Sequence, residues 1–113
     1  MEEKIHQDCM ANEDDFKALQ YTLDMIGSKW RPRILYSISV GENTRFNEVC
    51  NSLPGLSSRM LSRELKLMVE LKLVERVVRN THPITIEYKI TELGLSLSPV
   101  FPEMVKWGHE HMK

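Results

Sequence analysis

The chain has 113 residues, of which 42% are hydrophobic and 27% are charged, and its formal net charge is −1. These values fit one globular domain with a core of its own and exclude multidomain machinery. The chain has no run of about 18 apolar residues and begins with a polar, acidic segment, so we expect neither a membrane span nor a secretion signal.

The two cysteines, Cys9 and Cys50, are too few for a disulfide framework, and the four histidines are scattered without zinc-ligand spacing. We therefore expect a cytoplasmic protein that needs neither a metal nor a cofactor. No paired carboxylates, glycine-rich phosphate loop or nucleophile–base pair stands out, which argues against an enzyme.

The charged residues are unevenly distributed. Residues 1–15 carry six acidic side chains and one lysine, whereas residues 16–113 carry 14 basic and 10 acidic side chains. Between residues 57 and 79 there are six basic and three acidic side chains. A local basic stretch in a nearly neutral protein indicates a phosphate-rich partner, although a solvated helix face would have the same composition.

The first part of the chain shows no hydrophobic periodicity until a helix begins. We expect residues 1–14 to form a flexible acidic arm in front of a single domain at 15–113. Asp15 is the predicted N-cap of the first helix, because apolar residues recur at helical spacing after it. Gly27 is predicted to end that helix.

Two further helices are expected before a turn. One opens at Ser28 and ends at Gly41, and it tolerates Pro32 because a first turn has few hydrogen-bonded backbone donors. A short helix capped by Asn47 ends near Leu53, where a Pro-Gly pair breaks it.

The next helix, at about 58–72, has two different faces. An apolar stripe repeats at steps of three or four residues and consists of Leu61, Leu65, Met68 and Leu71. The opposite face is polar and basic and carries Arg59, Ser62, Arg63 and Lys66. Ser57 or Ser58 caps this helix.

After Lys72 the hydrophobic period changes from 3.6 to 2, which predicts strands at 73–79 and 85–90 joined by a hairpin loop. Alternation in the second strand predicts three inward side chains, Ile86, Tyr88 and Ile90. Thr91 is expected to cap a last helix that reaches about His111, with a kink at Ser98–Pro99.

A helix–turn–helix followed by a β-hairpin is the winged-helix plan, so we expect a mainly α fold with a small β-hairpin wing. The first and last helices have more apolar surface than a monomer of this size can cover. The last helix alone carries Leu93, Leu95, Leu97, Val100, Phe101, Met104, Val105 and Trp107. We therefore expect a homodimer that forms through the N- and C-terminal helices and reads a palindromic site.

The chain resembles the HxlR family of bacterial winged helix–turn–helix regulators, which are relatives of the MarR group. The matching blocks are Leu23–Trp30, Ile34–Tyr36, Arg45–Val49, Leu53–Lys66, Leu73–Arg76 and the pattern from Pro83 to Gly94. The resemblance covers about residues 16–108. It implies a dimeric, cytoplasmic transcriptional regulator that binds double-stranded DNA.

In this interpretation the polar face of the fourth helix enters the major groove. Its expected DNA-contacting residues are Ser57, Ser58, Arg59, Ser62, Arg63 and Lys66. The serines meet phosphate at the helix N-terminus, and the arginines reach guanine edges or phosphates. The hairpin loop is expected to touch flanking DNA through Arg79, Asn80, Thr81 and His82. Lys29 and Arg45 are candidate phosphate clamps, and Trp30, Phe46 and Tyr88 are expected in the core.

The resemblance also raises the question of thiol sensing. Some members of the family sense oxidants or electrophiles through a cysteine thirteen residues before the tryptophan that corresponds to Trp30, but here that position is Lys17. Cys9 lies eight residues earlier, among acidic side chains that disfavour a thiolate. Incidental cysteines and a redox pair between Cys9 and Cys50 both stay open, as does a small-molecule or oxidant effector.

The sequence therefore predicts a repressor that binds a palindromic operator as a homodimer. A protein-interaction module on the same scaffold is the alternative, because a fold alone does not fix a function. Loss of activity on removal of the basic face would separate the two.

Overall fold

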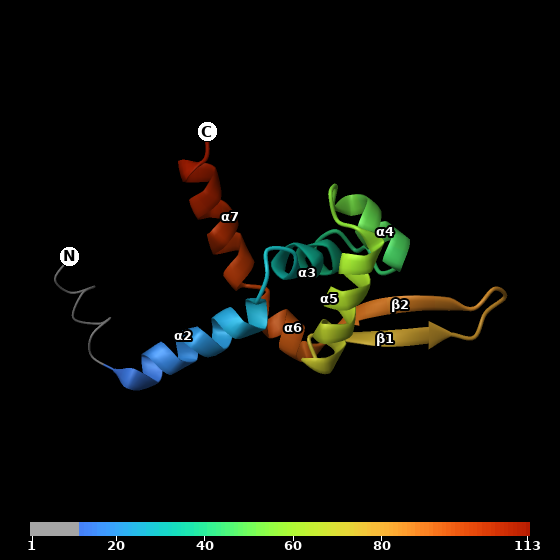
Figure 1. Cartoon of the computed structure of the whole chain (residues 1–113), viewed down its shortest axis with the longest axis horizontal. Helices are drawn as coiled ribbons and strands as arrows, with labels where there is room; N and C mark the ends of the chain where they lie inside the picture. Colours follow the sequence, from blue (N-terminus) through green and yellow to red (C-terminus); the bar gives the residue numbers. More distant parts are fainter. Residues whose placement is uncertain (1–11) are drawn as a thin grey trace.

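The computed structural model describes residues 12–113, in the element order shown in Figure 1. The elements are α2 (Glu13–Ile26), α3 (Arg31–Ser39), α4 (Phe46–Ser52), α5 (Ser58–Glu70), β1 (Val74–Arg79), β2 (Thr85–Ile90), α6 (Glu92–Leu97) and α7 (Val100–His111). Helices α3, α4 and α5 and the hairpin form a body, from which α2 and α7 extend (Figure 1). No helix in this part of the chain is long and apolar enough to cross a membrane.

Helix α2 begins earlier than the sequence predicts. The Asn12 side chain accepts the backbone N–H of Asp14 at 2.9 Å, so Asn12 is the N-cap and Asp15 lies inside the first turn. The helix thus starts within the predicted arm, and residues 1–11 of that arm lie outside the described residues. Gly27 ends the helix as predicted, with φ at 67° and its N–H donated to the Leu23 carbonyl.

The two following helices also start at other residues than expected. Helix α3 begins at Arg31 rather than at Ser28, whose hydroxyl instead accepts the Arg31 backbone N–H. Helix α4 begins at Phe46, so Asn47 is not its cap. Arg45 is the N-cap residue, and the Glu48 carboxylate accepts its backbone N–H at 3.0 Å.

The core lies where α3, α4 and α5 meet the start of the hairpin. Its buried apolar residues are Trp30, Ile34, Leu35, Ile38, Val49, Leu56, Leu61, Leu65, Met68, Leu73, Val74 and Phe101. Each fully buried aliphatic side chain in this set contributes about 1.5–3 kcal/mol. Trp30 is buried, and Phe46 and Tyr88 pack against the core, which confirms their predicted role.

The hairpin pairs β1 and β2 antiparallel, with Val74 opposite Ile90 and Arg79 opposite Thr85. The loop before α4 pairs with the outer side of β2, because the Tyr88 N–H donates to the Thr44 carbonyl at 2.7 Å. Tyr88 and Ile90 pack on the core as predicted. The prediction for Ile86 is wrong, because its side chain is 37% exposed. The hairpin extends beyond the body (Figure 1).

The predicted last helix is divided into α6 and α7 at Ser98–Pro99, where the kink was expected. Thr91 caps α6 by accepting the Gly94 N–H at 3.1 Å. A Cβ atom at Gly94 would lie 2.3 Å from the Leu73 carbonyl oxygen, so only glycine lets α6 approach the start of β1 this closely.

Helices α2 and α7 expose their apolar side chains. No residue of α2 is buried, and in α7 only Phe101 is. The exposed apolar residues of the two helices are Phe16, Leu19, Tyr21, Leu23, Val100, Met104, Val105 and Trp107. An apolar groove of about 390 Å³ lies between α3 and α7, lined by residues that include Tyr36 and Met104.

Candidate nucleic-acid interface

Helix α5 is fixed to the body by one face and presents the other. Its apolar stripe is confirmed, because Leu61, Leu65 and Met68 are at most 1% exposed. Leu71 lies just past the last turn and is half-buried. The Ser57 hydroxyl accepts the Met60 N–H at 3.1 Å and caps the helix. All six residues expected on the outward side are exposed, namely Ser57, Ser58, Arg59, Ser62, Arg63 and Lys66.

The basic side chains of this face are not neutralised by neighbouring carboxylates. Within residues 12–113 the structure has two ion pairs, Arg31–Glu64 and Arg79–Glu87. Arg59 and Arg63 take part in neither, so both guanidinium groups are available to a phosphate or a base edge.

A groove of about 370 Å³ separates α5 from the hairpin. From α5 it is lined by side chains that include Ser62, Lys66 and Glu70, and from the hairpin by Arg76 and Tyr88. Sequence reasoning counted Arg76 as a charge but did not select it as a site residue. The alternation of side chains along β1 was the available signal for Arg76, because this residue lies opposite Tyr88 and on the same side of the strand as Val74.

The hairpin loop is exposed at all four expected positions, Arg79, Asn80, Thr81 and His82. Two of the four side chains have partners. The Arg79 guanidinium pairs with Glu87, and the Thr81 hydroxyl donates to the Pro83 carbonyl at 2.8 Å. In the described part of the chain, the side chains of Asn80 and His82 make no hydrogen bond, so they are the unengaged polar groups of the tip.

Glu87 has a perturbed carboxyl group. Hydrogen bonding from Arg79 lowers its pKa from the usual 4.5, and the charges of Arg79 and Arg45 and a hydrogen bond from Thr44 act in the same direction. Desolvation opposes them. The ionised carboxylate therefore offsets part of the Arg79 charge.

Lys29 and Arg45, the candidate clamps, are both exposed. Lys29 Nζ lies 5.4 Å from the centroid of the Trp30 ring, and Arg33 Cζ lies 4.3 Å from it. Arg33 is a further exposed cation that sequence reasoning did not select. Its spacing of three residues from Trp30 on one helix was the available signal.

Of the two cysteines, the structure describes Cys50. Cys50 is half-buried in α4, and its thiol donates to the Leu56 carbonyl at 3.6 Å. Cys9 lies outside the described residues.

Comparison with known proteins identifies the family. The model of the HxlR-like helix-turn-helix family matches residues 25–113. The chain is 37% identical over 89 residues to the HTH-type transcriptional regulator YdzF of Bacillus subtilis, which covers 79% of this chain and 82% of YdzF.

Two solved structures support the same assignment. The redox regulator HypR in its oxidized form has a TM-score of 0.77 and 32% identity over 85% of this chain and 98% of that one. Reduced YodB of Bacillus subtilis has a TM-score of 0.71 and 28% identity over 85% and 93% of the two chains. These relatives are transcriptional regulators rather than enzymes. The chain belongs to the HxlR-like helix–turn–helix family of DNA-binding transcriptional regulators.

Proposed function

We propose that the protein is a repressor that binds a palindromic operator as a homodimer. Helix α5 is the recognition helix and enters the major groove, and the hairpin touches the flanking DNA. The observation that carries this proposal is the outward face of α5, on which Arg59 and Arg63 are exposed and outside both ion pairs of the described chain.

The recognition helix has the chemistry for two kinds of contact. Arg59 and Arg63 are one turn apart, about 6 Å along the helix axis, so both can address neighbouring base pairs in one groove. An arginine reads guanine by donating two hydrogen bonds to its O6 and N7 atoms. Ser57 and Ser58 lie at the helix N-terminus, where backbone N–H groups and the helix dipole favour phosphate.

The groove between α5 and the hairpin suits the DNA backbone. Lys66 and Ser62 line it from the helix and Arg76 lines it from β1, so a phosphate strand in the groove would meet cations on both sides. The hairpin tip, with Asn80, Thr81, His82 and Arg79, then reaches the next groove. Lys29 and Arg45 act as backbone clamps beside the helix.

The apolar side chains of α2 and α7 support a dimer. Leu19 is 58% exposed and Trp107 is 65% exposed, on helices that extend away from the body (Figure 1). Exposed apolar surface of this kind is typical of an interface between subunits. A two-fold axis would present two recognition helices to half-sites about 34 Å apart, which is one turn of DNA.

DNA binding at two salt concentrations tests this function. The probes are duplexes from upstream of the protein's own gene and its neighbours, with a shuffled duplex of equal length as the control. We expect one upstream duplex to bind at least about 1,000-fold more tightly than the shuffled one. Its affinity falls steeply as salt rises, because each phosphate contact contributes about one to the log–log slope. Equal, salt-insensitive binding to all duplexes would favour the protein-interaction module instead.

A redox-controlled regulator is a second candidate. It is supported by the likeness to HypR, a redox regulator, and by the thiol of Cys50, which lies within the helix–turn–helix. Oxidation would join Cys50 to Cys9, within or between chains, and change operator binding. The test is an oxidant titration of operator binding for the parent and for a variant with both cysteines replaced by serine. Identical titrations would exclude thiol control.

A further inference from the structure

We infer that Arg31 is a positioning residue that fixes the direction of α2 relative to the recognition helix α5. In the dimer this contact sets the separation of the two recognition helices, and so the spacing of half-sites that the protein accepts. The part that concerns DNA rests on the proposed function.

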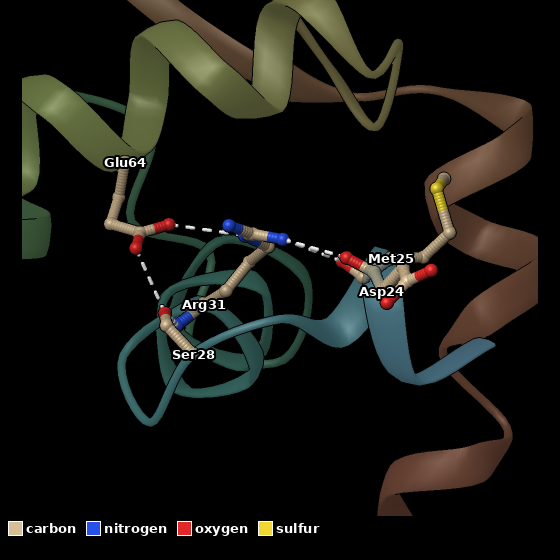
Figure 2. A network of polar contacts seen from close by, with 5 residues as sticks. All are labelled: Asp24, Met25, Ser28, Arg31 and Glu64. Atoms are coloured by element: carbon tan, nitrogen blue, oxygen red, sulfur yellow. Dashed lines mark hydrogen bonds and ion pairs between the residues drawn. The ribbon is translucent and has the colours of Figure 1, made fainter. Parts of the chain in front are cut away.

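Arg31 connects two helices that are far apart in the sequence. Its side chain is 7% exposed, and its Nε donates to the Glu64 carboxylate on α5 at 3.1 Å. Its Nη1 donates to the backbone carbonyls of Asp24 and Met25 in the last turn of α2, at 3.2 and 3.1 Å. Figure 2 shows the guanidinium between the carboxylate and these two carbonyls.

Ser28 closes the network on the other side of Glu64. Its hydroxyl donates to the second carboxylate oxygen at 2.8 Å and accepts the backbone N–H of Arg31 at 3.1 Å (Figure 2). Both oxygens of Glu64 are therefore used, and the loop between α2 and α3 is bound to α5. We call Ser28, Arg31 and Glu64 the joint.

The joint places a positive charge at the C-terminal end of α2. Its last turn has no basic residue of its own, so Arg31 supplies the positive charge that the carbonyl end of a helix favours. Gly27 leaves room for the Arg31 guanidinium, because a Cβ atom at this position would lie 2.0 Å from Arg31 Nη1. The glycine thus serves both the turn, with φ at 67°, and the close approach of the guanidinium.

Apolar packing holds only the end of α2. No residue of α2 is buried, and Met25, near the end of the helix, is partly buried against the core. A helix of 14 residues is about 21 Å long, so a tilt of about 10° at its base would move its far end by about 4 Å. If that end contacts the partner subunit, the tilt changes the distance between the two DNA-binding faces.

A purely stabilising role is the competing explanation. A buried ion pair is weak evidence for stability, because its desolvation offsets its attraction. The joint differs from a single pair in that one guanidinium contacts two helices at once. Lysine keeps the charge but has no rigid fork, so Arg31→Lys separates charge from geometry.

The first experiment measures the joint without DNA. Spin labels are placed at Lys17 on α2 and Arg59 on α5, in a background with both cysteines replaced by serine. Labelled protein is diluted with unlabelled chain so that only distances within one chain are seen. The variants are Arg31→Lys and Glu64→Gln, and the control is Glu75→Gln, which makes the same charge change at an exposed position of β1, outside the groove between α5 and the hairpin.

We expect one narrow distance distribution for the parent and for Glu75→Gln, and a distribution about twofold broader for both joint variants, because one lacks the guanidinium and the other lacks the carboxylate. Circular dichroism identifies a variant that has failed to fold, and Arg31→Lys then carries the comparison alone. Equal widths in all folded proteins would overturn the inference.

The second experiment moves the half-sites of the operator apart by one or two base pairs. The parent and Glu75→Gln should lose at least about tenfold in affinity, whereas the joint variants should lose at most about threefold, because their α2 direction is less strictly set. The affinity of the joint variants for an isolated half-site should match that of Glu75→Gln. Unchanged spacing discrimination in the joint variants would overturn the inference. If the parent binds no DNA, the proposed function fails, and the distance measurement still decides on the joint.

Discussion

Arg63 shows how a single side chain of α5 can be tested. It is exposed, takes part in neither ion pair of the described residues and lies opposite the buried Leu61–Leu65 stripe. Arg63→Ala should weaken specific operator binding by about 1–3 kcal/mol if the contact is to a base. Fluorescence anisotropy on the operator measures this. Lys106→Ala, which removes an exposed charge from α7, should bind like the parent, and equal affinities for all three proteins would show that the recognition face is misassigned.

Glu87 gives a prediction on pH. Its carboxyl pKa is lowered in the folded chain, mainly by the hydrogen bond from Arg79. A lowered folded pKa means that the ionised group stabilises the hairpin fully above its usual value of 4.5, and that this contribution is lost as the pH falls through the lowered pKa.

After correction for intrinsic rates, amide exchange in β2 of the parent should therefore accelerate as the pH falls below 4.5, towards the rate of Glu87→Gln, whose own rate should not change over this range. Glu75→Gln is the matched control, because Glu75 is exposed on β1 and takes part in neither ion pair of residues 12–113. It should keep the acid response of the parent. An unchanged acid response in Glu87→Gln would contradict the role of the Arg79–Glu87 pair.

At the residue scale, the sequence predicts which side chains are exposed better than it predicts which side chains form ion pairs. The stripe of α5 is enough to place Arg59 and Arg63 outward, because helical period fixes the opposite face. The pairs Arg31–Glu64 and Arg79–Glu87 depend on how separate elements pack, so no local pattern indicates them. N-caps are also difficult to predict. Asp15 and Asn47 are favourable cap residues, but Asn12 caps α2 by accepting the Asp14 N–H, and the N-cap of α4 is Arg45.

At the scale of elements, hydrophobic periodicity and helix breakers in the sequence locate the helices and strands of residues 12–113 to within a few residues. Ile86 shows the limit of such patterns. Alternation states which side of a strand a residue faces, but not whether anything covers that side. The hairpin extends past the body, so an inward position at its far end stays exposed (Figure 1). Pairing of the loop at Thr44 with Tyr88 is likewise not visible in the sequence.

The exposed face of α2 gives the prediction at this scale. Leu19→Glu places a charge among apolar side chains that we propose are buried in the dimer, so it should shift the protein to monomer. Analytical ultracentrifugation at micromolar concentration measures the shift. Lys17→Glu is the control, because it introduces a glutamate at an exposed position on the polar side of α2. A parent that is monomeric, or a Leu19→Glu variant as dimeric as the parent, would contradict the interface.

At the scale of the whole molecule, the chain combines a compact DNA-binding body with two helices that leave it. The body could be predicted, because its core comes from short-range patterns in α3, α5 and the hairpin. The directions of α2 and α7 could not, because they depend on the joint and on the break at Pro99. In the proposed dimer these directions decide how two bodies face one DNA duplex, so they connect the fold to the choice of operator.

Methylation protection on the operator tests the proposed arrangement of two recognition helices in a dimer most directly. Dimethyl sulfate reacts with guanine N7 in the major groove, which is the atom that an arginine of α5 would cover. We predict two protected patches on one side of the duplex, with centres about 10 base pairs apart, both lost in Arg59→Ala/Arg63→Ala and kept in Lys106→Ala. Protection confined to one patch, or protection that survives loss of both arginines, would contradict a dimer that reads DNA through α5.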